Sequence, residues 1–317
     1  IKPFTGGSFG GKNDLFDEII VALMAMETRS PVRLSLTRWE EFVGTRTRHA
    51  NRFYLKLGFK SDGLLHARDL RAYLNAGGYS ASSPKVAMTT GHRWMMLYRT
   101  PHVRYEGIAS YTNFPVAGAF RGFGTPQQTF AMELLMDRAA EALGMDALDL
   151  RLKNHVRVGD YDEMSKITIG SSGMGDCVQR GAEAVGWSEK RGQKIKNGTK
   201  VRGVGMGIGT HNTGVKPFVN EVTGAILKIN EDGTVNISVG ACDLGQGSDT
   251  VLAQMAAEVL GIDPERIDVF NGDTEFCPYD NGTHSSRQAY MAGNAVKIAA
   301  EEARDQLLRV VADLLEA

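Results

Sequence analysis

The chain has 317 residues, 42% of them hydrophobic, which is enough for two or three domains with buried cores. Its 36 basic and 37 acidic residues leave a net charge of −1, and this balance gives no reason to expect a nucleic acid or a membrane surface as partner. No run of 18 apolar residues predicts a membrane span, and three cysteines without a C-x-x-C pair predict no zinc or iron–sulfur site and favour a reducing, cytoplasmic compartment.

The first twelve residues, IKPFTGGSFGGK, form a glycine-rich loop in which Phe9 stands between two pairs of glycines. A helical pattern follows at once, with one face formed by Leu15, Ile19, Ile20, Leu23 and Met26. Glycines let backbone N–H groups approach a ligand, and a helix N-terminus adds partial positive charge. The loop therefore suits a phosphate or an oxyanion, and a tight turn without a ligand is the alternative.

Residues 6–13 also read G-x-x-x-x-G-K-N, which is one residue away from the phosphate-binding loop of nucleotide hydrolases. That loop needs Ser or Thr after the Lys, because the hydroxyl group holds magnesium. Asn13 has no hydroxyl group, so nucleotide hydrolysis is the weaker interpretation.

The rest of the first half reads as strands followed by helices. Alternation predicts strands at 32–37, 53–59, 64–74 and 103–111, and Asp62-Gly63 predicts a hairpin turn. Residues 80–100 have no clear pattern.

A second glycine-rich stretch, residues 119–127, opens a helix that we expect Thr125 to cap and that runs to about Ala142. The side chains expected to face inward are Phe130, Leu134, Leu135 and Ala139. A shorter helix follows at 146–154.

The second half repeats this plan after a polar segment, which places a domain boundary near residue 165. A helix at 174–185 and a basic linker at 190–200 come first. The further elements are strands at 224–229 and 234–239 around Asp232-Gly233, a glycine loop at 243–248, a helix at 249–260, a strand at 267–270, a loop at 282–288 and a long helix ending near Glu316.

Hairpin, glycine loop, helix and strand thus recur in both halves. The expected fold class is α+β, built of two-layer sandwiches of hairpins and helices. We expect two lobes, residues 1–165 and 166–317.

Four loops of one type point to a shared anionic ligand. Donors to its phosphate or oxo groups would be the backbone N–H groups of Phe9, Gly10, Arg121 and Ser285. The Gln246 amide suits the edge of a heterocycle, and the rings of Phe9 and Phe123 suit a flat guest. The alternative is that both rings are core anchors and that Arg121 forms a surface ion pair.

The stretches GGSFGGK, AFRGFGTPQ, DLGQGSDTVLAQMAAEVLG and SSRQAYMAGNAV resemble the molybdenum-binding large subunit of the xanthine dehydrogenase/aldehyde oxidase family. The resemblance covers nearly the whole chain in the same order, and 4-hydroxybenzoyl-CoA reductase and nicotinate dehydrogenase are most similar around residues 285–287. It implies the molybdopterin-binding part of a molybdenum hydroxylase, an oxidoreductase that acts on an electron-poor carbon of an aromatic, N-heteroaromatic or aldehyde substrate.

The resemblance also implies the ligands and the residues that hold them. The cofactor would be molybdopterin with molybdenum, as its cytosine dinucleotide, between the lobes, with iron–sulfur clusters and FAD on partner subunits. The implied cofactor-binding residues are Phe9, Gly10, Arg121, Gly122, Gly245, Gln246, Gly247, Ser285, Ser286 and Gln288. Beside the molybdenum ligands would lie the amides of Phe9, Arg121 and Ser285, and Asn13 and Phe123 would face the substrate.

Three departures from the family pattern matter. Purine-oxidising members carry Glu after the motif Lys, where this chain has Asn13. The family's catalytic Glu lies in a downstream motif that this sequence does not contain, so we assign no catalytic residue here. The domain that precedes GGxFGGK is also absent. We therefore expect an internal piece of the molybdenum subunit that is inactive by itself and that partners the rest of that subunit, with a cofactor-carrying or structural module as the alternative.

Overall fold

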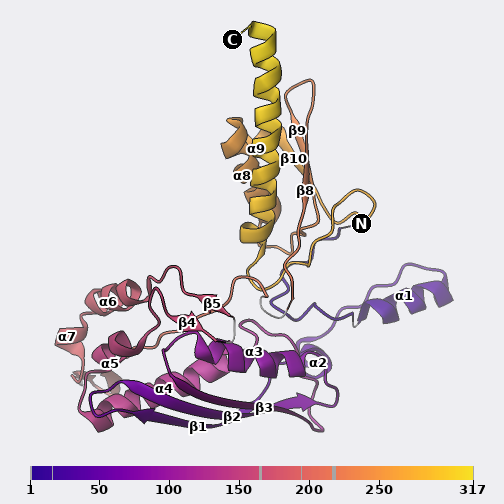
Figure 1. The fold of residues 1–317 in the computed structure, drawn as a ribbon. Coiled ribbons are helices and arrows are strands. Elements are labelled where there is room, and N and C mark those ends of the chain that lie inside the picture. Colours follow the sequence, from indigo (N-terminus) through magenta and orange to yellow (C-terminus); the bar gives the residue numbers. More distant parts are fainter. Residues whose placement is uncertain (1, 16, 164–165, 194, 216–218, 317) are drawn as a thin grey trace. The chain divides into compact units, whose positions relative to one another are not determined.

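A computed structural model describes residues 2–15, 17–163, 166–193, 195–215 and 219–316 (Figure 1). The chain forms two compact units. The large unit is Phe9–His211, and the small unit joins Ile1–Ser8 to Asn212–Ala317. The lobes expected from the sequence remain a prediction.

The large unit contains a three-stranded sheet with the strand order β1-β2-β3. β1 (Asn51–Phe59) pairs antiparallel with β2 (Leu65–Gly77), which confirms the hairpin predicted there. β3 (His102–Tyr111) pairs parallel with β2. A parallel neighbour requires a crossover connection, and α3 (Ser83–Met95), in the stretch without a clear pattern, supplies it.

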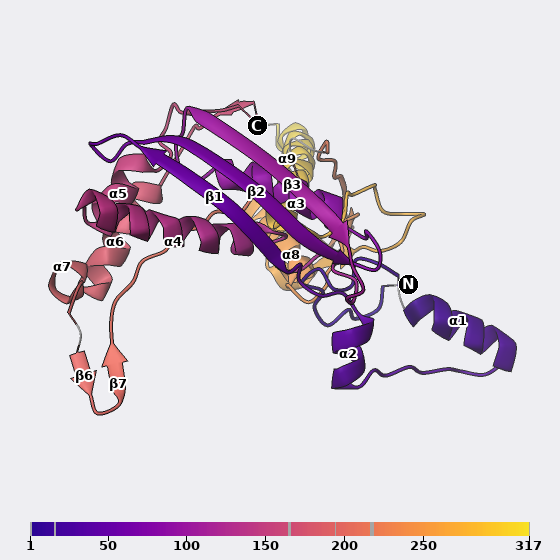
Figure 2. The same ribbon diagram turned by 90° about the horizontal axis from the view of Figure 1, so that it is seen from below.

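Helices α3 and α4 (Thr125–Leu143) lie on one face of this sheet and enclose the core (Figures 1 and 2). Its fully buried apolar side chains include Leu65, Leu70, Leu74, Trp94, Met132, Met136 and Leu150. The other elements of the unit are α1 (Asp17–Thr28), α2 (Arg38–Gly44), α5 (Ala147–Asn154), β4 (Tyr161–Asp162), β5 (Ile167–Thr168), α6 (Met174–Val185), α7 (Trp187–Lys190), β6 (Ile195–Asn197) and β7 (Lys200–Arg202).

The small unit repeats the same topology. β8 (Ala225–Ile229) and β9 (Val235–Val239) form an antiparallel hairpin, and β10 (Ile267–Phe270) adds parallel to β9 after the crossover helix α8 (Ser248–Leu260). The long helix α9 (Gln288–Leu315) packs with α8 over the sheet, and the short 3₁₀ turn η1 (Pro264–Arg266) precedes β10. The core consists of Val235, Ile237, Val239, Leu252, Ala256, Ala292 and Val296, among others.

The expected α+β class and the structural repeat are therefore confirmed. Each unit contains a hairpin, a crossover helix, a parallel third strand and a covering helix in that order. The sheets are not purely hairpins, because the third strand of each is parallel to the middle one.

The strand expected at 32–37 is wrong. Those residues have no strand partner, and Thr37 instead caps α2. The backbone N–H of Glu40 donates to Thr37 Oγ1 at 3.3 Å, and Thr37 N–H donates to Glu40 Oε2 at 2.7 Å. This capping box satisfies the N–H groups at the helix start, which explains why the chain turns there.

The inward face predicted for α4 is wrong for two of its four residues. Phe130 and Leu134 are 68% and 50% exposed, whereas Met132 and Met136 are buried. Ala139 packs against the core as predicted, and Leu135 is partly buried. Apolar residues occupy two faces of this helix, and the buried face also carries an ion pair, in which Arg151 Nε donates to Glu133 Oε2 at 2.8 Å. The helix cap is Gly124 rather than Thr125.

Two further expectations need adjustment. The stretch at 190–200 is not only a linker, because β6 and β7 form a short hairpin there. Helix α1 forms as predicted, but its isoleucine, leucine and methionine side chains are about half or more exposed, and none of its described residues is buried. Among the described residues, no helix has both the length and the apolar character that crossing a bilayer requires.

Candidate functional site

In the large unit, the first glycine loop packs against the second. Gly10 has φ +97°, and a Cβ at this position would lie 2.7 Å from the carbonyl of Ala119. Only glycine permits this approach. Phe9, with φ +52°, keeps its ring 70% exposed. Asn13 is exposed, and its neighbour Asp14 accepts from Arg46 Nε at 2.9 Å.

The second loop turns tightly before α4. Three successive residues have positive φ: Gly122, Phe123 and Gly124. The Phe123 N–H donates to Phe120 O at 2.7 Å, which closes the turn. The Phe123 side chain packs against the core, whereas Arg121 is exposed and makes no ion pair with a described residue.

Two arginines that the sequence analysis did not single out hold this loop. Arg93 donates from one Nη to Gly122 O at 2.9 Å and to Thr125 Oγ1 at 3.1 Å. Arg48 donates to Arg121 O at 2.7 Å. Burial lowers the pKa of Arg93 to about 10, so its guanidinium stays charged at neutral pH. Neither arginine belongs to a recognisable motif, so the sequence carried no signal for this role.

In the small unit, the 243–248 loop is organised around the carboxylate of Asp243. Its Oδ1 accepts from the Gly245 N–H at 2.6 Å, and its Oδ2 accepts from the Asp249 N–H at 3.3 Å. Burial raises the pKa of Asp243, but the backbone N–H groups of Gly245, Asp249 and Gly247 outweigh it, and the net pKa is lowered. These amides are therefore already engaged within the chain.

The side chain of Gln246 folds back onto the same loop. Its Oε1 accepts from the Leu244 N–H at 2.7 Å, and its Nε2 donates to Ser248 Oγ at 2.9 Å and to Cys242 O at 3.3 Å. Gln246 thus fixes the loop shape in addition to any contact with a ligand.

The 282–288 loop is joined to its neighbours in the small unit. Ser285 and Ser286 both have positive φ, which is uncommon for residues other than glycine. Thr283 Oγ1 donates to Cys242 O at 2.6 Å, and Gln288 Nε2 donates to Thr283 Oγ1 at 2.5 Å. The third and fourth loops predicted from the sequence are therefore linked through Thr283.

Arg287 holds this loop in place through its buried guanidinium group, and it was not predicted as a site residue. It is fully buried and donates from Nε to Glu221 Oε2 at 2.6 Å and from one Nη to Asp280 Oδ1 at 2.7 Å. A further Nη donates to Val222 O at 2.9 Å. A buried cation with two carboxylates explains how two adjacent serines keep a strained backbone.

The first residues of the chain complete the small unit. Gly7 N–H donates to Leu244 O at 2.6 Å, and a Cβ on Gly245 would lie 3.1 Å from the Gly7 nitrogen. Lys2 forms an ion pair of 2.5 Å with Asp249. The initial glycine stretch thus contributes Gly7 to the small unit and Phe9–Gly10 to the large one.

The amides proposed as donors share one property. No described residue accepts a hydrogen bond from the backbone N–H groups of Phe9, Gly10, Arg121 and Ser285. Their loops leave these groups available to a ligand, in contrast to the amides held by Asp243.

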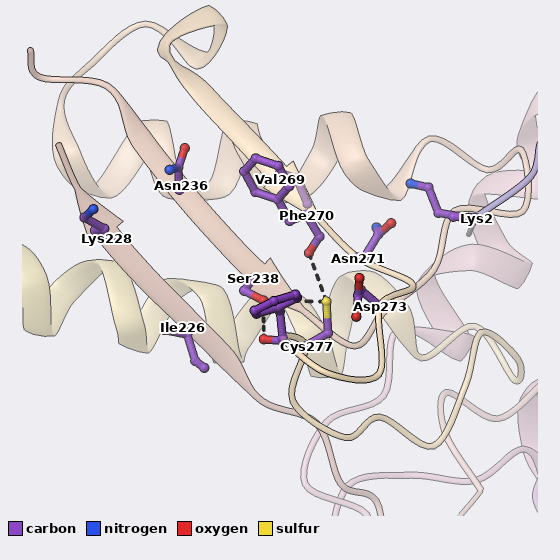
Figure 3. Close-up of a pocket in the computed structure, with 11 residues that line it drawn as sticks. Lys2, Ile226, Lys228, Asn236, Ser238, Val269, Phe270, Asn271, Asp273 and Cys277 are labelled. Atoms are coloured by element: carbon purple, nitrogen blue, oxygen red, sulfur yellow. Dashed lines mark hydrogen bonds between the residues drawn. The ribbon is translucent and has the colours of Figure 1, made fainter.

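A separate groove of about 550 Å³ lies on the sheet face of the small unit (Figure 3). Its residues come from β8, β9, β10, the segment 271–277 and Lys2. The sequence analysis did not predict it.

The sequence matches the molybdopterin cofactor-binding domain family over residues 1–155 and again over residues 180–317. Among curated proteins, the putative xanthine dehydrogenase molybdenum-binding subunit XdhA of Escherichia coli K12 is 37% identical over 99% of this chain and 42% of its own length. The chain thus spans about two fifths of that relative.

Solved structures agree with the sequence match. The aldehyde oxidoreductase from Desulfovibrio gigas superposes with a TM-score of 0.80 and 31% identity over 94% of this chain and 33% of its own. Quinoline 2-oxidoreductase from Pseudomonas putida 86 has a TM-score of 0.82 and 25% identity over 99% of this chain and 42% of its own.

Proposed function

We propose that this chain, which belongs to the molybdopterin cofactor-binding family of the xanthine dehydrogenases and aldehyde oxidoreductases, is the cofactor-binding part of a molybdenum hydroxylase. The parent enzyme would oxidise an electron-poor carbon of an aromatic, N-heteroaromatic or aldehyde substrate. The observation that carries the proposal is the set of backbone N–H groups, in three of the matching motifs, that have no acceptor in the part of the chain that the structure describes.

The polar groups of each unit fit such a cofactor. In the large unit, the free amides of Phe9 and Gly10 and the exposed cation of Arg121 suit phosphate or oxo groups. In the small unit, Asp280 Oδ2 and Gln288 Oε1 are buried without a partner among the described residues. Buried acceptors favour a ligand with N–H donors, and a pterin has them.

When bound, the molybdenum cofactor supplies two-electron redox chemistry. The chain's own task is to hold and orient it. Arg48 and Arg93 fix the carbonyls of Arg121 and Gly122, and so hold the backbone of the second loop in one conformation. Ser285, Ser286 and Gln288 would do the same in the small unit. Gly122 in the large unit, and Gly245 and Gly247 in the small unit, would allow close approach.

The finer details of cofactor and partners extend this proposal. We expect the cytosine dinucleotide form of the cofactor, as the family resemblance implies. We also expect iron–sulfur clusters and FAD on partner subunits, since the three cysteines of this chain have no cluster spacing. The remainder of the molybdenum subunit would be a further partner, because the chain spans 42% of its relative. We also expect a cytoplasmic location, which the free thiols support.

Metal analysis tests the proposal directly. We expect about one molybdenum per copy of this chain in the parent complex purified from molybdate-fed cells, together with extractable pterin. Repeated preparations with neither molybdenum nor pterin would contradict it.

Gln246→Ala is expected to reduce cofactor retention more than it disturbs folding. The substitution removes hydrogen bonds worth about 0.5–1.5 kcal/mol each from a surface loop outside the core. Molybdenum content and thermal unfolding would be compared with those of Gln193→Ala, which loses a similar exposed hydrogen bond in the large unit. Loss of the fold in Gln246→Ala, with the wild type folded without cofactor, would make Gln246 purely structural.

Asn13 motivates a prediction about the substrate. A neutral amide cannot pair ionically with a purine, although it can donate to a carboxylate or a carbonyl. We expect kcat/KM in the full complex to favour nicotinate or a 4-hydroxybenzoyl thioester over hypoxanthine, and Asn13→Glu to shift the preference towards hypoxanthine. A xanthine dehydrogenase subunit is among the similar relatives, so purines are the specific competitor. If hypoxanthine is already the best substrate, or if Asn13→Glu changes nothing, the role given to residue 13 is wrong.

A further inference from the structure

Arg93 is a buried cation that forms no ion pair with any described carboxylate. Its side chain is 4% exposed, and no acidic group offsets the effect of burial on its pKa. The other buried arginines differ. Arg151 and Arg287 each pair with two carboxylates, and Asp162 raises the pKa of Arg68 against the effect of burial. A buried guanidinium without a counter-ion costs free energy, which suggests that its partner is a ligand.

The protein uses only part of the Arg93 guanidinium. Nη1 donates to Gly122 O at 2.9 Å and to Thr125 Oγ1 at 3.1 Å. No described residue accepts a hydrogen bond from Nη2 or from Nε, and Nε is buried. Nε and Nη2 present two parallel N–H groups on one edge of the planar group, which is the fork that pairs with a carboxylate. This unused fork is therefore a preformed site for a planar anion.

The fork lies next to the second glycine loop of the large unit. The same guanidinium holds the carbonyl of Gly122, which stands between Arg121 and Phe123 in the chain. These two neighbours are the residues that the family resemblance places beside the cofactor and the substrate. An anion bound to the fork would therefore lie beside the loop that we propose to face the reaction.

A segment after β7 leads from α4 to the surface near Arg93. The Ile208 N–H donates to Glu133 Oε2 at 2.9 Å, and a Cβ on Gly209 would lie 3.6 Å from Thr129 Cγ2. His211 follows and is exposed. Burial and then the charge of Arg93 lower the pKa of His211, so the imidazole lies within electrostatic reach of the guanidinium and is neutral at pH 7.

This neighbourhood limits the charge of a fitting ligand. Because His211 is neutral, it adds no second positive charge to that of Arg93. A carboxylate carries one negative charge and two coplanar oxygens, which match one guanidinium and its fork. A phosphate dianion would leave one charge unbalanced in a buried place.

We propose that the free edge of Arg93 binds the carboxylate of the substrate, so that the enzyme selects a free aromatic or N-heteroaromatic acid over the corresponding amide or thioester. This inference rests on the proposed function and narrows its substrate class. The carboxylate accepts from Nε and Nη2, while Nη1 continues to hold the second loop.

Nicotinate and nicotinamide test this, because they share a ring and differ only in a carboxylate or a carboxamide. Equilibrium dialysis of the labelled compounds against the purified parent complex gives both dissociation constants. We expect the wild type to bind nicotinate at least about tenfold more tightly than nicotinamide, since two charged hydrogen bonds are formed. Arg93→Met should abolish this preference. Arg93→Lys, which keeps the charge without the fork, should retain only part of it. The ratio of kcat/KM values should follow the same order.

Thr125→Val is the matched control. It removes an acceptor of Nη1 and leaves the fork intact, so the ratio of the two affinities should not change even where a looser loop weakens both ligands. Both affinities are measured on the same protein, so the ratio does not depend on the folded fraction of each variant.

The outcomes separate this inference from the cofactor function. A wild type without preference, or an unchanged ratio in both Arg93→Met and Arg93→Lys, overturns the carboxylate site. Equal losses for both ligands also overturn it, because Arg93 would then act only by holding the loop or by pairing with a carboxylate elsewhere in the subunit. Dialysis does not require molybdenum. A complex that retains molybdenum without the preference contradicts the carboxylate site alone, and one with an Arg93-dependent preference that never retains molybdenum contradicts the cofactor function alone.

Discussion

Arg287→Met is expected to destabilise the small unit by about 3–5 kcal/mol, because it leaves two almost completely buried carboxylates without their cation. Glu221 and Asp280 would lose their common cation, and the carbonyl of Val222 would lose a donor. Burial makes this cost large, since neither carboxylate can recover its hydration without opening the loop.

The distribution of tryptophan makes this effect measurable. Trp39, Trp94 and Trp187 all lie in the large unit, so tryptophan fluorescence follows that unit while far-ultraviolet circular dichroism follows both. In urea, Arg287→Met should lower the unfolding midpoint of the small unit, which is detected by circular dichroism alone. The midpoint of the large unit, which fluorescence also detects, should not change. Arg304→Met is the control, because Arg304 lies on α9, the helix that begins directly after Arg287, and forms an exposed ion pair with Asp305 that contributes little to stability. Equal effects of the two substitutions would show that the Arg287 network does not support the unit.

Gly10→Ala is expected to have the largest effect on the large unit among substitutions of the first loop. The residue has φ +97°, and the new methyl group would lie 2.7 Å from the carbonyl of Ala119. Strain and overpacking together should cost about 2–4 kcal/mol. They would also separate the first loop from the second, so molybdenum retention in the parent complex should fall as well.

Gly6→Ala is the matched control for Gly10→Ala. Gly6 also has positive φ, at +66°, but no atom lies within 4 Å of the position of the new Cβ. Its cost should be limited to the backbone, about 1–2 kcal/mol. The fluorescence-detected transition should move for Gly10→Ala and remain unchanged for Gly6→Ala, because Gly6 belongs to the small unit. Full retention of molybdenum in Gly10→Ala would show that contact with Ala119 is not needed to hold the cofactor.

The elements with strong local signals could be predicted from the sequence. The hairpins at Asp62-Gly63 and Asp232-Gly233 depend on turn chemistry, and α6 depends on clear periodicity, so all three form where predicted. Residues 32–37 alternate equally well, yet they are not a strand, because alternation cannot tell whether a partner strand is available. The periodicity of α4 likewise allows either apolar face to turn inward, so the burial of Met132 rather than Phe130 could not be read from the helix alone.

In the candidate site, too, the features with a local sequence signal could be predicted, and those that depend on tertiary contacts could not. Glycine-rich motifs identified the loops, since the backbone conformations they need restrict the residue types. The supporting arginines, Arg93 and Arg287, were missed because each acts through carbonyls or carboxylates that lie far away in the sequence or carry no motif. The groove of the small unit was missed for a similar reason, since three strands must align before it exists.

The internal bonding of the 243–248 loop has a consequence for the thermodynamics of cofactor capture. Asp243 and Gln246 hold the loop from within, by contacts that need no ligand. The conformational entropy of this segment is therefore lost when the chain folds, and its loss does not reduce the free energy of cofactor binding. Association should then resemble the meeting of two rigid bodies, with an affinity that reflects the contacts formed and little further change in protein flexibility.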